Sequence, residues 1–78
     1  MPSFKTILTD IAKAIVEHPD EVVVSETEDG DNITLVLSVS ESDMGKVIGR
    51  NGRIARAIRL LIKSSANTAG KRVNVEIR

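Results

Sequence analysis

Val47-Ile48-Gly49-Arg50-Asn51-Gly52-Arg53-Ile54 is the stretch of this 78-residue sequence that decides the fold. Its two glycines, three residues apart, allow a sharp turn with positive φ and leave room for a ligand to approach the backbone. Apolar residues recur at helical spacing on both sides, so we expect the turn to join two helices. The first spans about residues 43–48, capped by Ser42 or Asp43. The second runs from Arg53 to about Asn67, before the stop signal Gly70.

The loop is predicted to lie at the N-terminus of the second helix, which gives it a specific chemistry. Free backbone N–H groups and the positive end of the helix dipole make such a position a ready anion site. Arg50 and Asn51 stand between the glycines and add a charge and an amide, while Lys46 and Arg53 flank them. This combination suits a sugar–phosphate backbone.

The remaining chain supplies one helix and three strands around this motif. Residues 3–17 carry apolar side chains at helical spacing, with Ser3 as the expected N-cap and His18 as a cation at the helix end. Residues 22–28 and 33–39 are expected strands joined by a turn at Gly30, and residues 72–78 alternate as a third strand.

The expected order is therefore α-β-β-α-α-β over one domain, residues 1–78. A hairpin makes the first two strands antiparallel, and the long helical crossover makes the second and third strands candidates for parallel neighbours. The fold class expected is α+β: two layers, with a three-stranded mixed sheet and the helices on one face.

Composition argues against several classes of function. The chain has no cysteine and one histidine, so disulfide frameworks, zinc sites and histidine-based triads are not expected. Asp29 and Asp31 suggest a calcium loop, but Ile33 stands where a third oxygen ligand is needed. We therefore expect no metal, no cofactor, no catalytic residues and no small-molecule substrate.

Location and partner follow from hydropathy and charge. No apolar stretch reaches the roughly 18 residues of a membrane span, and residues 1–4 do not open a signal peptide, so a cytoplasmic protein without membrane insertion is expected. Residues 1–43 hold ten acidic residues and two lysines, whereas residues 44–78 hold nine basic residues and one acid. The basic half predicts a polyanionic partner, unless both halves mix into one solvated surface.

With these residues and this element order, the sequence resembles the KH domain in its type II, bacterial form. It is most similar to the small stand-alone bacterial KH proteins of the KhpA type, through residues 19–22, 45–54 and 71–73, and the match covers essentially the whole chain. The GXXG loop of KH domains clamps about four nucleotides of single-stranded nucleic acid. The resemblance thus implies binding of single-stranded RNA with low specificity, as an RNA-binding protein or RNA chaperone.

The resemblance also implies a binding groove and a protein partner. Because the chain has one aromatic residue, Phe4, the resemblance implies that bases lie in an aliphatic groove rather than on stacking rings. Val47, Ile48 and Ile54 are the expected contributors to this groove, unless they belong to the core. KhpA-type proteins pair with themselves or with a larger KH protein of the KhpB, or Jag, type, so a homodimer or heterodimer is implied. The candidate RNA-binding residues are Lys46, Val47, Ile48, Gly49, Arg50, Asn51, Gly52, Arg53, Ile54 and Arg56.

The helix after the loop is predicted to have two faces. At about 100° per residue, its basic residues gather on one side and its apolar residues on the other. We expect Arg53 and Arg56 to contact nucleic acid, and Arg59 and Lys63 to be solvated. Leu60 falls on the basic side, where it could form a subunit contact. The expected apolar face comprises Ile54, Ile58, Leu61 and Ile62.

Two other functions remain open from the sequence. A helix-turn-helix DNA-binding protein also joins two helices by a glycine-containing turn, but it has no use for three strands. A protein-interaction adaptor, which pairs with a larger KH-containing partner, would use the loop only as a tight turn, with RNA binding secondary.

Overall fold

The computed structural model describes residues 3–78, and its elements follow the predicted order. Three short 3₁₀ turns, Pro19–Glu21, Glu41–Asp43 and Arg50–Gly52, connect them. The helices and strands are α1 (Phe4–Ile15), β1 (Val23–Asp29), β2 (Asn32–Ser38), α2 (Met44–Ile48), α3 (Arg53–Thr68) and β3 (Arg72–Ile77).

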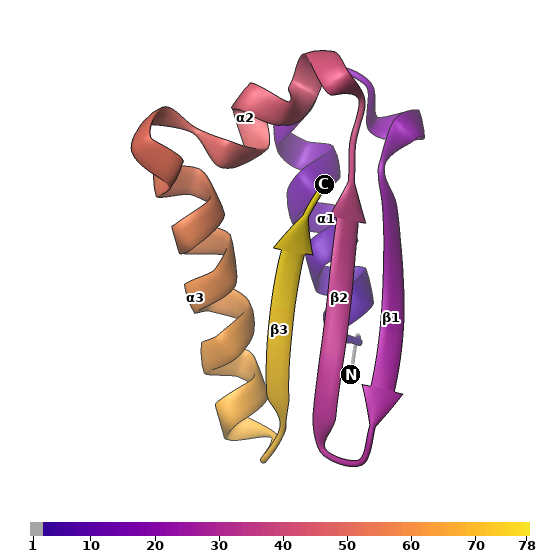
Figure 1. Ribbon diagram of the computed structural model, residues 1–78, viewed down its shortest axis with the longest axis vertical. Coiled ribbons are helices and arrows are strands. Elements are labelled where there is room, and N and C mark those ends of the chain that lie inside the picture. Colours follow the sequence, from indigo (N-terminus) through magenta and orange to yellow (C-terminus); the bar gives the residue numbers. More distant parts are fainter. Residues whose placement is uncertain (1–2) are drawn as a thin grey trace.

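The sheet has the predicted mixed topology, with strand order β1-β2-β3. β1 and β2 pair antiparallel, with Val24 opposite Leu37, around a turn in which Gly30 has φ 62°. β2 and β3 pair parallel, with Ile33 opposite Val73. Figure 1 shows α1 behind the sheet, α3 along the β3 side and α2 across the end at which β2 terminates.

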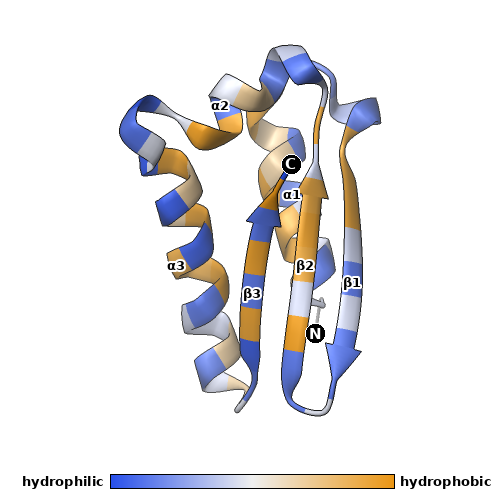
Figure 2. Ribbon diagram, in the orientation of Figure 1, coloured by the Kyte–Doolittle hydropathy of each residue, from blue (hydrophilic) through white to orange (hydrophobic). Residues whose placement is uncertain are grey.

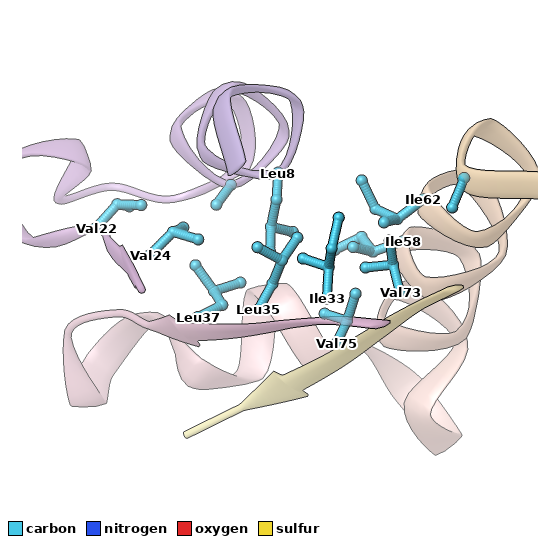
Figure 3. Packing of buried hydrophobic residues seen from close by; sticks show 12 residues of the cluster. Leu8, Val22, Val24, Ile33, Leu35, Leu37, Ile58, Ile62, Val73 and Val75 are labelled. Atoms are coloured by element: carbon cyan, nitrogen blue, oxygen red, sulfur yellow. The ribbon is translucent and has the colours of Figure 1, made fainter. Parts of the chain in front are cut away.

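The hydrophobic core lies between the sheet and the two longer helices. Inward side chains of the strands point toward α1 and α3, as Figure 3 shows, and Leu35 and Leu37 of the central strand are fully buried. Buried and more exposed positions alternate along β2 and β3, which matches one buried face. In Figure 2 apolar and polar residues alternate along β3, whereas Val36 makes the upper half of β2 continuously hydrophobic. The buried cluster contains Leu8, Ala12, Val22, Val24, Ile33, Leu35, Leu37, Ile58, Ile62, Ala66, Val73 and Val75.

Two details of the helical prediction are wrong at the end of α1. The N-cap is as expected, since the Ser3 side chain accepts a hydrogen bond from the N–H of Thr6. The helix, however, ends at Ile15 rather than residue 17. The N–H groups of Glu17 and His18 donate to the side chain of Asp43 and are thereby lost to the helix. His18 is consequently a partner of this carboxylate, not a cation in the last turn.

The packing face of α3 also differs from the prediction. The helix is buried through Ala55, Ile58, Ile62 and Ala66. Leu61, expected in the apolar face, is 58% exposed because it lies at the margin of this stripe. Leu60 is 67% exposed, as expected. The outer side of α3 therefore carries two adjacent leucines in contact with solvent.

Candidate nucleic-acid interface

Three of the four residues in the loop between α2 and α3 have positive φ, and Arg50 is the exception. Gly49 has φ 73° and ψ 175°, Asn51 has φ 56° and ψ 25°, and Gly52 has φ 73° and ψ 17°. The N–H of Gly52 donates to the carbonyl of Gly49 at 3.2 Å and closes the turn. Asparagine is the non-glycine residue that best tolerates the left-handed region, which explains its place between the glycines.

The two glycines serve different purposes. A Cβ on Gly49 would lie 2.6 Å from Cγ1 and 3.0 Å from Cβ of Ile54, so the missing side chain accommodates a packed isoleucine rather than a ligand. A Cβ on Gly52 would meet only the Arg56 side chain, at 4.0 Å. The side-chain position is thus open at Gly52, whereas at Gly49 it is filled by Ile54.

Arg56 connects the helix to the loop. Its guanidinium donates a hydrogen bond to the main-chain carbonyl of Asn51. This contact was not predicted, because nothing in helical spacing says that a basic side chain will reach back to a loop carbonyl. Arg56 therefore stabilises the conformation of the loop, in addition to placing a positive charge beside it.

The exposed surface around the loop is basic and aliphatic. The side chains of Arg50, Asn51 and Arg53 are all exposed. Ile48 and Ile54 are 38% and 39% exposed and flank the turn. Val47 is fully buried, so it belongs to the interior and does not line a groove. The aliphatic surface beside the loop is formed by the two isoleucines.

Asp43 fixes the start of α2 from within the molecule. Its carboxylate is fully buried and accepts hydrogen bonds from the N–H groups of Glu17 and His18, at 3.1 and 3.0 Å. The ring Nδ1 of His18 lies 3.1 Å from the same carboxylate. Asp43 does occupy the N-cap position of α2, as predicted, but its side chain caps nothing in that helix. It joins the segment after α1 to the helix that leads into the loop.

The environment shifts both pKa values of this pair. The hydrogen bond to Asp43 raises the pKa of His18 above its ordinary value of 6.5, against some desolvation. Burial disfavours the charged form of Asp43, but hydrogen bonds from Glu17 and His18 outweigh it and hold the pKa of Asp43 below its ordinary value of 3.8. Both groups are therefore stabilised in their charged forms.

A pH dependence of stability follows from these shifts. Because folding raises the pKa of His18, protonated His18 stabilises the folded state fully below pH 6.5, and this contribution is lost as the pH rises through the folded-state pKa. Because folding lowers the pKa of Asp43, ionised Asp43 stabilises the folded state above pH 3.8, and this contribution is lost as the pH falls through the folded-state pKa. We expect the melting temperature to fall by a few degrees from pH 6 to 8.5, and His18→Gln to abolish that fall. Thermal unfolding followed by circular dichroism measures both; an equal fall in the variant would contradict this assignment.

Lys46 forms an ion pair through its ammonium group with a glutamate in the segment that follows α1. Its ammonium lies 2.9 Å from Oε1 of Glu17, and this hydrogen bond raises the pKa of Lys46. Because both side chains are partly exposed, the pair adds little stability. The pair directs the Lys46 side chain toward the segment after α1, and the Glu17 carboxylate partly neutralises its charge. Among the candidate RNA-binding residues, Lys46 is therefore the one whose positive charge is least available to a phosphate.

Arg59 is the second basic side chain whose role the sequence did not reveal. Its Nε donates to the carbonyl of Val75 at 3.2 Å. β3 is an edge strand, and this bond satisfies one of its unpaired carbonyl groups. Arg59 thus ties α3 to the edge of the sheet, whereas a fully solvated side chain was expected.

Neither a metal-binding cluster nor a membrane-spanning helix is found in the described part of the chain. No group of three or more His, Asp or Glu side chains within residues 3–78 could hold a metal ion. No helix among these residues is long and apolar enough to cross a membrane.

Comparison with known proteins supports the interpretation of the fold. The chain over residues 5–77 matches the family model described as KhpA/KhpB, KH domain. In solved structures, the arrangement resembles part of Aquifex aeolicus Era bound to GDP·AlF₄⁻, with TM-score 0.68 and 21% identity, over 95% of this chain and 29% of that one. Era in complex with 16S ribosomal RNA nucleotides aligns with TM-score 0.70, over 95% of this chain and 28% of that one. The chain thus spans less than a third of either Era chain.

Curated relatives match along almost their whole length. The RNA-binding protein KhpA of Clostridium acetobutylicum is 55% identical over 73 residues, which cover 94% of this chain and 97% of the relative. KhpA of Halalkalibacterium halodurans is 47% identical, over 94% and 96%. KhpA of Caldanaerobacter subterraneus is 51% identical, over 91% and 95%. With a mixed sheet, a GXXG turn between two helices and relatives of this similarity, the chain belongs to the KhpA/KhpB KH-domain family.

Proposed function

We propose that this protein is a cytoplasmic, low-specificity RNA-binding protein or RNA chaperone that holds single-stranded RNA at residues 49–52, by binding and without catalysis. The observation that carries the proposal is the start of α3. Its N-cap, Gly52, has left-handed geometry and no side chain that caps the first turn. A 16-residue helix thus presents its positive end at an exposed loop, beside Arg50 and Arg53, where a phosphate fits.

Several features favour a single RNA strand as the ligand. The relatives carry the description RNA-binding protein. Ile48 and Ile54 offer small aliphatic surfaces beside the loop that unstacked bases can cover. A duplex has its bases stacked and paired, so these surfaces would have no partner there. Backbone contacts and two partly exposed isoleucines give modest affinity and little sequence preference.

The salt dependence of binding tests the phosphate contacts. Each neutralised phosphate of a single strand contributes a slope of roughly −0.7 to the plot of log affinity against log salt. Three contacts, from Arg50, Arg53 and the start of α3, give an expected slope near −2. Fluorescence anisotropy with labelled single-stranded RNA between 50 and 200 mM salt (order-of-magnitude choices) measures it. A slope near zero, or tighter binding to duplex DNA of the same sequence, would contradict the proposal.

Association with a second KH domain is the other part of the proposal, and the exposed leucines favour it. Leu60 and Leu61 are consecutive residues of α3, 67% and 58% exposed, and their side chains point about 100° apart around the helix. Each adds apolar surface to the outer side of α3 that a second copy, or the KH domain of a KhpB-type protein, can cover. Two linked RNA sites raise the apparent affinity by avidity, which compensates for weak binding at each.

The oligomeric state checks this association. We expect the protein to sediment as a homodimer at micromolar concentration, and Leu60→Glu with Leu61→Glu to make it monomeric, because two charges cannot be buried unpaired. Val23→Glu changes another exposed apolar residue, 59% accessible on β1, and should leave the dimer intact. A wild-type monomer that also fails to bind a KhpB-type KH domain would overturn the association. If the protein pairs but RNA does not bind, the adaptor function replaces RNA binding.

A further inference from the structure

An open surface cavity lies at the end of α3 far from the loop. It has a volume of about 230 Å³ and opens between the last turns of α3 and the beginning of β3. In Figure 1 this is the end of the molecule opposite α2. The volume is far larger than the roughly 15 Å³ that a single water needs. The cavity is lined by Lys63, Asn67, Lys71, Arg72, Val73 and Asn74.

The charges of this lining favour an anion. Three of the six residues are basic and none is acidic. Lys71 is occupied, because its ammonium lies 3.3 Å from Asp31 and 4.0 Å from Glu28. Among residues 3–78, by contrast, Lys63 and Arg72 have no carboxylate within 4.0 Å. The cavity therefore holds two positive charges that no acidic side chain of the described chain neutralises.

The remaining lining groups suit a nucleobase. Asn67 and Asn74 provide amide groups that both donate and accept hydrogen bonds. The strand at the cavity is an edge strand, so main-chain N–H and C=O groups of β3 that do not bond β2 are available there. Val73 adds apolar surface. Such donors and acceptors can form hydrogen bonds with the edge of an unstacked base, and a guanidinium plane such as that of Arg72 can stack on its ring.

The cavity lies in line with the loop along one face of α3. At about 100° per residue, Arg53, Arg56 and Lys63 share the same side of the helix. Ten residues separate Arg53 from Lys63, a rise of about 15 Å. Between them, Arg59 bonds the edge of β3 and adds a further positive charge. A strand that leaves the loop along this face passes Arg56 and the exposed Leu60 before it reaches Lys63 at the cavity.

We propose that the cavity binds one nucleotide of the RNA strand held at residues 49–52, with its phosphate at Lys63 and Arg72 and its base at the amides and the β3 edge. This inference rests on the proposed function of the loop. It gives a single chain a footprint longer than the four or so nucleotides that a GXXG loop clamps, and it makes RNA length, more than RNA sequence, the determinant of affinity.

The test compares two lengths of RNA on the same protein. Random-sequence single-stranded RNA pools of about four and about ten nucleotides bracket the loop footprint, and anisotropy gives the affinity of each. We expect the longer RNA to bind roughly ten-fold more tightly, with a salt slope steeper by about 1.4 for two additional phosphate contacts. The variant Lys63→Gln with Arg72→Gln should reduce the affinity of the longer RNA to that of the shorter one and leave the shorter one unchanged.

A matched control separates this site from general electrostatics. Lys5→Gln with Lys13→Gln removes the same charge from exposed positions on α1 and should alter neither affinity. Equal losses for both RNA lengths, or an unchanged affinity of the longer RNA in the Lys63 and Arg72 variant, would overturn the cavity site while leaving the loop. Failure of both RNAs to bind the wild-type protein would overturn the loop proposal and this one together.

Discussion

Replacement of Arg50 and Asn51 together by aspartate is expected to weaken RNA binding by at least a hundred-fold. Both side chains are exposed at the turn, and the substitutions place two negative charges where phosphates are expected. Like charges brought together at an interface cost several kcal/mol, which corresponds to a hundred-fold or more in affinity. RNA titration by anisotropy measures this loss.

The fold should survive this double substitution. Aspartate tolerates the left-handed geometry of residue 51, both glycines remain, and acids are favourable at a helix N-terminus. The matched control is Lys5→Asp with Thr6→Asp, which makes an equal change of charge at exposed positions in the first turn of α1, distant from the loop. We expect unchanged melting temperatures for both variants and normal RNA affinity for the control. Normal RNA affinity in the loop variant would mean that residues 49–52 connect the two helices without binding RNA, and the adaptor function would then replace RNA binding.

Gly49→Ala is expected to cause the largest loss of stability of any single substitution in the motif. With φ 73° and ψ 175°, Gly49 occupies a region that is essentially restricted to glycine, and the new Cβ would overlap Ile54. Backbone strain and overpacking together cost roughly 2–5 kcal/mol. For a domain of this size, that lowers the melting temperature by about 10 °C or more.

Two neighbouring glycines provide controls for this prediction. Gly45 lies inside α2 with open space around its Cα, so Gly45→Ala should raise stability by about 0.5–1 kcal/mol. Gly52 has left-handed geometry that asparagine can adopt, so Gly52→Asn should cost less than Gly49→Ala. Chemical denaturation gives the three free energies. Ile54→Ala in the Gly49→Ala background should recover part of the loss, and equal stability of Gly49→Ala and wild type would refute the packing role of Gly49.

The topology was predictable from the sequence because short-range patterns determine it. The alternation of residues 33–37 and 73–77 identifies strands with one buried face, and the helical crossover between them fixes a parallel pair. The glycines at 49 and 52 likewise marked the turn, since both indeed have positive φ. In each case the information lies within a few residues of the position it determines.

The interactions that the sequence did not reveal connect residues distant in the chain. The buried carboxylate of Asp43 accepts hydrogen bonds from the N–H groups of residues 26 and 25 positions earlier in the chain. No local sequence pattern predicts contacts over such a separation. Leu61 was misassigned because helical spacing gives the side of a helix but not how far the neighbouring elements cover that side. The pairing of Arg59 with the β3 edge depends on how α3 docks on the sheet. These contacts decide which basic residues remain free for a ligand.

Backbone amide NMR of the 78-residue protein during titration with single-stranded RNA tests the central claim most directly. If the loop clamps the RNA backbone, the largest shifts fall on residues 49–54, with smaller shifts along the Arg53 side of α3. The buried core residues of β2, such as Leu35, should hardly move. Shifts centred on Leu60 and Leu61, or on the open face of the sheet, with residues 49–54 unchanged, would contradict it.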